Sequence, residues 1–122
     1  MSDELLNQAD LAAQRAYAPY SNYLVGAIVR TKSGEEFAGV NVESAAYPLG
    51  VCAEKSALVA AATAGHRPGD IEAIAITASP CGGCRQWLHE WRIPLVVFRR
   101  ADGSIARLSC DDLLPEAWDL PE

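Results

Sequence analysis

The chain has 122 residues, which suits one compact domain spanning residues 1–122 and leaves little room for a second. Half of the residues are hydrophobic and 21% are charged, and no apolar run approaches the roughly 20 residues that a membrane-spanning helix needs. The formal net charge of −6 argues against a nucleic acid polymer or a membrane surface as the partner and favours a small neutral substrate.

The first half of the chain has the pattern of a helix followed by a hairpin. Residues 3–17 place leucine and alanine on one stripe of an amphipathic helix, and Pro19 follows in a segment that breaks it. Residues 23–31 and 36–42 have the composition of two strands joined by a tight turn. Residues 43–50 are expected to form a loop.

The second half of the chain predicts two helices and three strands. The helices are expected at about residues 52–64 and 84–91. The strands are expected at residues 71–78, 94–100 and 105–109, and the first of them is apolar enough to be buried on both faces. The resulting order α-β-β-α-β-α-β-β predicts an α/β fold, a three-layer α-β-α sandwich with a five-stranded mixed sheet.

Four cysteines occur in a chain whose N-terminus is acidic and polar, unlike a secretory signal. We therefore expect a cytoplasmic protein. Cytoplasmic thiols bind metals or take part in chemistry more often than they form disulfides.

Three of the cysteines lie at predicted helix starts. Cys52 and Glu54 open one helix, and the segment Pro-Cys-Gly-Gly-Cys places Cys81 and Cys84 at the start of another. Helix N-termini favour the thiolate form that a metal needs. Three protein ligands leave the fourth position of zinc open, so that zinc can lower the pKa of a bound water. Glu54 can then take the proton of that water and deliver it to a ring nitrogen and a departing amine.

A Cys-x-x-Cys pair also occurs in structural zinc sites and in redox sites. A structural site would need a fourth ligand, which Cys110, His66 or His89 could supply. Cys110 lies at a predicted strand end, and His89 lies in a helix where a surface histidine is expected. The Cys-x-Glu and Pro-Cys-x-x-Cys pattern matches the known signature of zinc deaminases, which favours the catalytic interpretation.

The resemblance extends well beyond that signature. Residues 16–27, 39–54, 79–86 and 112–118 resemble the small cytidine deaminase family, in the order of the family and over most of the chain. The all-cysteine ligand set is similar to the homotetrameric branch, which acts on free nucleosides. The resemblance implies one Zn²⁺ per subunit, hydrolytic deamination of cytidine or deoxycytidine to the uridine product, and pockets at subunit interfaces.

The resemblance also implies a pyrimidine nucleoside pocket. Asn41 and Glu43 match the positions that hydrogen-bond the ribose hydroxyls, and Tyr23 falls where the family usually has phenylalanine against the base. An amide and a carboxylate meet the donor and acceptor needs of a diol, and residues two apart on a strand point the same way. Without the resemblance, these residues would be interpreted as an ordinary polar strand end and an ordinary strand aromatic.

Three further positions carry over from the family. The backbone N–H of Ala53 and the carbonyl of Ser79 match groups that hold the base edge and its exocyclic amine. Trp118 takes the place of a tail aromatic that, in the family, reaches the pocket of a neighbouring subunit. Its alternative role is to cover the core of its own subunit.

The chain departs from the family pattern at two places. Lys55 stands where the three-cysteine branch usually has an arginine contacting the ligand sulfurs; lysine keeps the charge but lacks the planar fork of donors. The strand at residues 71–78 also runs almost directly into Ser79, without several residues that the family commonly has there. This shortening predicts tolerance of bulkier groups on the exocyclic nitrogen.

Two other functions remain open from the sequence. One is deamination of a cytosine-bearing antibiotic or a modified nucleoside at the same site. The other is a non-catalytic zinc-binding module, although Glu54 beside the open zinc position argues against it.

Overall fold

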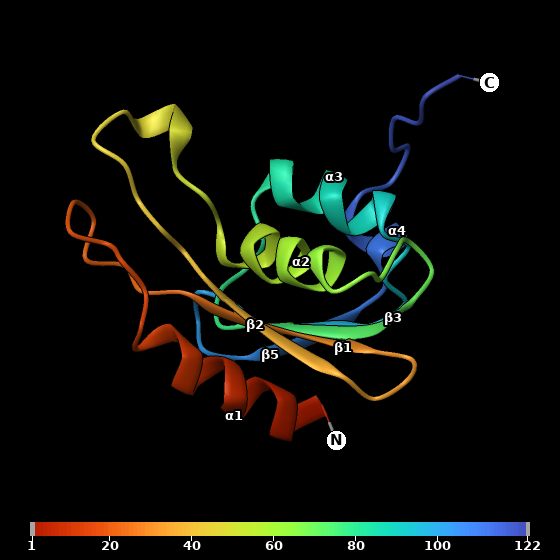
Figure 1. The fold of residues 1–122 in the computed structure, drawn as a ribbon, viewed down its shortest axis with the longest axis horizontal. Coiled ribbons are helices and arrows are strands. Elements are labelled where there is room, and N and C mark those ends of the chain that lie inside the picture. Colours follow the sequence, from red (N-terminus) through yellow and green to blue (C-terminus); the bar gives the residue numbers. More distant parts are fainter. Residues whose placement is uncertain (1, 122) are drawn as a thin grey trace.

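The computed structural model describes residues 2–121 (Figure 1). The α-helices are α1 (Ser2–Ala13), α2 (Ala53–Thr63), α3 (Gly82–Glu90) and α4 (Cys110–Leu113), and a short 3₁₀ helix, η1, spans Tyr47–Leu49. The strands are β1 (Gly26–Thr31), β2 (Glu36–Val40), β3 (Ile71–Ile76), β4 (Val96–Arg99) and β5 (Ile105–Leu108). Within residues 2–121, no helix combines the length and the apolar character needed to cross a membrane.

The five strands form one sheet in the order β2-β1-β3-β4-β5. β1 is antiparallel to β2 and to β3, β3 and β4 run parallel, and β5 is antiparallel to β4. Helix α1 covers one face of the sheet, and α2 and α3 cover the other (Figure 1). The predicted three-layer sandwich with a mixed sheet is confirmed.

The sheet separates two hydrophobic cores. Successive side chains of β1 point alternately into one core and the other. Ala27 and Val29 face the core shared with α2 and α3, whereas Ile28 faces the core shared with α1. β3 contributes apolar residues to both cores, as predicted from its continuous apolar run. The sheet therefore holds α2 and α3, which carry the cysteines, on one side.

Several predicted elements are longer than the observed ones. α1 ends at Ala13, and the first two strands stop short of residues 23–25 and 41–42. In these segments the chain makes isolated bonds instead of a ladder: the Tyr17 N–H donates to the Asn41 carbonyl at 3.0 Å. The predicted loop at residues 43–50 contains η1.

Cys110 does not end a strand but begins α4. Ser109 caps this helix, because its Oγ accepts from the Asp112 N–H at 3.1 Å while the Asp112 carboxylate accepts from the Ser109 N–H at 3.3 Å. This reciprocal arrangement is a capping box, which satisfies two backbone donors at a helix start.

Gly39 lets α2 approach the sheet closely. A Cβ at this position would lie 2.2 Å from the Ala57 backbone nitrogen and 2.5 Å from the Ala53 carbonyl oxygen. Both atoms belong to the backbone of α2, so a side chain could not be accommodated by a rotamer change. Since Ala53 is the first residue of α2, Gly39 helps to set the position of the helix start that follows Cys52.

The Gly39→Ala variant is expected to lower the free energy of unfolding by ~1–3 kcal/mol, because backbone must move to admit the methyl group. Urea unfolding of the zinc-loaded protein measures this change. Gly82→Ala is the matched control, since a Cβ at Gly82 meets nothing within 4 Å. Equal stabilities of the two variants would contradict the close packing of β2 against α2.

Candidate active site

The sulfurs of Cys52, Cys81 and Cys84 all lie within 4.8 Å of one another. Cys52 is the N-cap of α2, Cys81 is the N-cap of α3, and Cys84 lies in the first turn of α3. All three are free thiols. A tetrahedral zinc ion with Zn–S bonds of about 2.3 Å separates its sulfurs by about 3.8 Å, so the cluster has the size of a zinc site.

The chemistry of the three thiols also fits a divalent cation. Burial raises the pKa of Cys52 and of Cys84. Burial has the same tendency at Cys81, but hydrogen bonds from Cys84, from the Cys52 side chain and from the Gly83 backbone outweigh it and lower the pKa of Cys81. Three thiolates this close repel one another, and a bound cation offsets that repulsion and the loss of solvation.

Residues that could have supplied a fourth ligand are engaged elsewhere. His66 Nε2 lies 3.1 Å from a Glu35 carboxylate oxygen, and His89 Nε2 lies 2.7 Å from a carboxylate oxygen of Asp119. Among residues 2–121, the cluster of close ligand atoms consists of the three cysteines, without Cys110. Three ligands with an open fourth position are the pattern of a catalytic zinc site.

Glu54 lies beside the cysteines in the first turn of α2 and is only 4% exposed. Burial raises the pKa of its carboxyl group. A carboxylate with a raised pKa is a stronger base than an exposed glutamate and therefore a better proton acceptor. Glu54 therefore has the environment of a general acid and base.

A cavity of about 210 Å³ joins Glu54 to Cys52 and Cys81, whereas Cys84 does not line it. Seven of the residues predicted from the sequence line it: Tyr23, Asn41, Cys52, Ala53, Glu54, Ser79 and Cys81. Val25 and Ala78 also line the cavity, although no sequence motif predicted a role for them. Their positions offered a signal, because Val25 is two residues from Tyr23 in the predicted strand 23–31 and Ala78 precedes Ser79.

A family model described as the cytidine and deoxycytidylate deaminase zinc-binding region matches residues 1–100. The chain belongs to this deaminase family. The family match and the cluster of three free cysteines agree on zinc as the cofactor.

Individual members of the family match almost the whole chain. The cytidine deaminase of Halalkalibacterium halodurans is 38% identical over an aligned length of 122. The alignment covers 93% of this chain and 91% of that protein. The crystal structure of cytidine deaminase from Burkholderia pseudomallei has a TM-score of 0.90 and 42% identity, covering 97% of this chain and 99% of that one. The cytidine deaminase from Mycobacterium tuberculosis has a TM-score of 0.82 and 33% identity, covering 97% of each chain.

Asn41 holds a wall of the deaminase cavity through its side-chain amide. Its Oδ1 accepts from the Val25 N–H at 2.8 Å, and its Nδ2 donates to the Tyr23 carbonyl at 2.8 Å. These bonds fix the segment that carries Tyr23, a residue that is 62% exposed. Asn41 thus supports the cavity as well as lining it.

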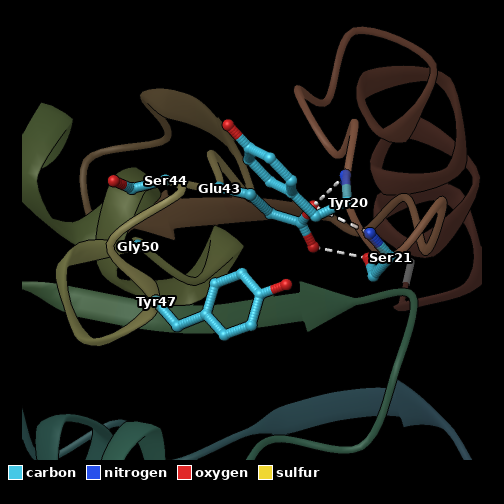
Figure 2. A pocket seen from close by; sticks show the side chains of 6 residues that line it. All are labelled: Tyr20, Ser21, Glu43, Ser44, Tyr47 and Gly50. Atoms are coloured by element: carbon cyan, nitrogen blue, oxygen red, sulfur yellow. Dashed lines mark hydrogen bonds between the residues drawn. The ribbon is translucent and has the colours of Figure 1, made fainter.

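Glu43 does not line the same cavity as Asn41. Its carboxylate accepts from the backbone N–H groups of Tyr20 and Ser21 at 3.0 and 3.1 Å and from the Ser21 hydroxyl (Figure 2). The hydrogen bond from Ser21 is the main reason that the pKa of Glu43 is lowered. Because β2 ends at Val40, the alternation of a strand does not carry on to Glu43.

Glu43 instead lines a second cavity of about 350 Å³, together with Tyr20, Ser21, Ser44, Tyr47 and Gly50 (Figure 2). This cavity lies between the segment around residue 20 and the segment 43–50, which carries η1. These segments are the two extended loops that project from the same end of the molecule in Figure 1. The structure therefore places Asn41 and Glu43 on neighbouring cavities.

Lys55 and Trp118 lie outside both cavities. A Cβ at Gly83 would lie 3.8 Å from Lys55 Nζ and 4.0 Å from Cys81 Sγ, so the ammonium group and the sulfur border the same glycine. The ammonium also lies 5.8 Å from the centre of the Trp87 ring. Lys55 thus places its charge near the thiolates.

Trp118 is 63% exposed and lies against α3. The Gln86 side chain donates to the Trp118 carbonyl at 3.0 Å, and Trp118 shares a surface cavity with Trp87 and Trp91. Within one subunit, Trp118 covers the outside of α3 and does not reach the metal cavity.

Proposed function

We propose that this chain catalyses the zinc-dependent hydrolytic deamination of cytidine and deoxycytidine to uridine and deoxyuridine, with release of ammonia. The observation that carries the proposal is the buried Glu54 carboxyl group on the same cavity as Cys52 and Cys81. The relatives that match almost the whole chain are cytidine deaminases, which supports the same substrate class.

Different residues of the chain carry out different steps of the reaction. Cys52, Cys81 and Cys84 would hold one zinc ion, which when bound activates a water molecule for attack on C4 of the base. Glu54 accepts a proton from the attacking water and delivers it to N3. It then accepts a second proton, from the hydroxyl group now on C4, and delivers it to the departing amine, so that the C4 carbonyl forms as the C4–N bond breaks and ammonia leaves.

The lining of the cavity supports the following substrate contacts. Tyr23 offers an aromatic face to the base. The Ala53 N–H and the Ser79 carbonyl hold the base edge and its amine. Asn41, and Glu43 from the adjoining cavity, receive the sugar hydroxyls, with the sugar extending from one cavity toward the other.

A substrate panel of cytidine, deoxycytidine and deoxycytidine monophosphate tests this function, with ammonia release as the readout. We expect turnover of both nucleosides and at least about 100-fold lower kcat/KM for the nucleotide. Among the described residues that line the two cavities, none is lysine or arginine, and Glu43 would repel a phosphate. Absence of turnover by the zinc-loaded protein would refute the function, and efficient turnover of the nucleotide would refute the nucleoside specificity.

We also propose that the enzyme accepts cytidines with a substituent on the exocyclic nitrogen. Only residues 77–80 separate the end of β3 from Cys81, and Ser79 is exposed, which leaves room beside the expected position of the amine. We expect N4-methylcytidine to yield uridine and methylamine, detected by chromatography. A complete lack of turnover of N4-methylcytidine, beside active turnover of cytidine, would contradict this proposal.

A homotetramer with pockets at subunit interfaces is the assembly that we propose, in the cytoplasm, where free thiols persist. Large hydrophobic side chains are exposed mainly on the two loops that frame the cavities: Tyr17, Tyr20, Tyr23, Leu24, Val42, Tyr47, Leu49 and Val51. Exposed large apolar side chains gathered on two neighbouring loops mark a contact with another chain. Covering it with further copies would also close the cavity that contains Glu43.

Light scattering coupled to size-exclusion chromatography is expected to show a particle of four chains of 13.1 kDa each. Tyr47→Glu, which places a charge on a side chain that is 75% exposed in the single chain, should produce smaller species. Leu11→Glu is the matched control, since Leu11 is 66% exposed and belongs to α1 rather than to either loop. A monomeric parent protein would contradict the tetramer.

A further inference from the structure

Arg85 follows the last of the three cysteines and engages all parts of its guanidinium group. Its Nε donates to the Pro80 carbonyl at 2.9 Å, its Nη1 donates to the Leu113 carbonyl at 3.2 Å, and its Nη2 donates to Ser79 Oγ at 3.3 Å. Its backbone N–H donates to the Cys81 carbonyl at 2.9 Å. One residue therefore ties the segment before α3 to the last residue of α4.

The segment that Arg85 holds is a wall of the metal cavity, because Ala78, Ser79 and Cys81 all line it. Residues 77–81 lie between β3 and α3, outside the strand ladder and outside the helix. The direction of their carbonyl groups is therefore set by the bonds made to the segment from outside. Arg85 donates two of these hydrogen bonds, one to the Ser79 hydroxyl oxygen and one to the carbonyl oxygen of the neighbouring Pro80.

We propose that Arg85 is a positioning residue that fixes the Ser79 carbonyl where the departing amine binds, without itself touching the substrate. The proposal rests on the proposed function, in which that carbonyl receives the exocyclic amine. Arg85 is half-buried and does not line the cavity. Its planar guanidinium group donates hydrogen bonds to acceptors in three fixed directions. The single ammonium group of lysine cannot reach all three acceptors at once.

The test compares a ligand that carries the amine with one that lacks it. In zinc-loaded Arg85→Lys, we expect kcat/KM for cytidine to fall about 10- to 100-fold, since a small misplacement of a contact group slows the reaction by such factors. The inhibition constant of the product uridine, which has no amine, should change by less than about 3-fold. The zinc content should stay at one ion per chain, and the thermal midpoint is recorded in parallel.

Arg67→Lys is the matched control. Arg67 also donates to two backbone carbonyls, those of Ala62 and His66, but it lies beyond the far end of α2. We expect it to leave cytidine turnover and uridine inhibition unchanged. Arg85→Gln, which keeps a planar donor without the charge, is the second test variant and should lower kcat/KM for cytidine in the same selective way.

Three results would overturn the proposal: wild-type kinetics in both Arg85 variants, equal weakening of cytidine and uridine, or loss of zinc or of cooperative unfolding in both. Equal weakening would mean that Arg85 supports the whole cavity rather than the amine position. A parent protein without cytidine turnover would instead refute the proposed function. The two failures are therefore distinguishable.

Discussion

The Glu54→Gln variant is expected to fold and to bind zinc as the parent protein does, while its kcat for cytidine falls by about 10³-fold, within the usual range for loss of a general acid and base. Glutamine keeps the shape of the side chain, which is 4% exposed, but it cannot accept a proton from water. Ammonia release measures kcat, and elemental analysis measures zinc per chain.

Glu4→Gln is the control for this variant. Glu4 lies in the first turn of α1, and α1 covers the face of the sheet opposite to α2 and α3 (Figure 1). Its replacement should leave kcat unchanged. Appreciable turnover by zinc-loaded Glu54→Gln would refute the proton-transfer role, whereas a variant without zinc would show that Glu54 contributes to metal binding.

The second large effect is expected for Cys81→Ser, which should lose both zinc and activity. A serine hydroxyl does not ionise near neutral pH and is a poor ligand for zinc compared with a thiolate. Hydrogen bonds from Cys84 and Gly83 lower the pKa of Cys81, so this residue contributes the thiolate that forms most readily. Zinc per chain should fall from one to near zero, and the thermal midpoint should fall because the ion stabilises the folded state.

Cys110→Ser is the matched control, because Cys110 is buried at the start of α4 and stands apart from the three clustered sulfurs. It should keep zinc and turnover. Loss of zinc from Cys110→Ser would indicate a structural site with four protein ligands. It would contradict the open coordination position that a catalytic zinc ion needs. Retention of a full zinc complement by Cys81→Ser would remove Cys81 from the ligand set.

Short-range patterns in the sequence were sufficient for the architecture and for the metal cluster. Alternation and apolar runs predicted all five strands, because each strand presents a buried face to α1 or to α2 and α3. The spacing of Cys81 and Cys84 placed both sulfurs at one helix start, and the crossover from Cys52 was short enough to return the chain there. The family resemblance on these motifs agrees with the family match.

Contacts between distant parts of the chain were decided only by the tertiary structure. Glu43 is drawn to the backbone of Tyr20 and Ser21, more than 20 residues away, and so leaves the cavity of Asn41. Glycine is needed at position 39 because the backbone of α2 packs against it. One acceptor of Arg85, the Leu113 carbonyl, lies at the end of α4.

The sequence by itself therefore predicted which residues would bind zinc and move protons, because those properties depend on residue type and on spacing at two helix starts. The tertiary structure decided which of the remaining polar and aromatic residues share a cavity with them. The physical reason is that hydrogen-bond partners and close backbone contacts depend on how the loops fold back. The local periodicity of hydrophobic residues contains no information about that.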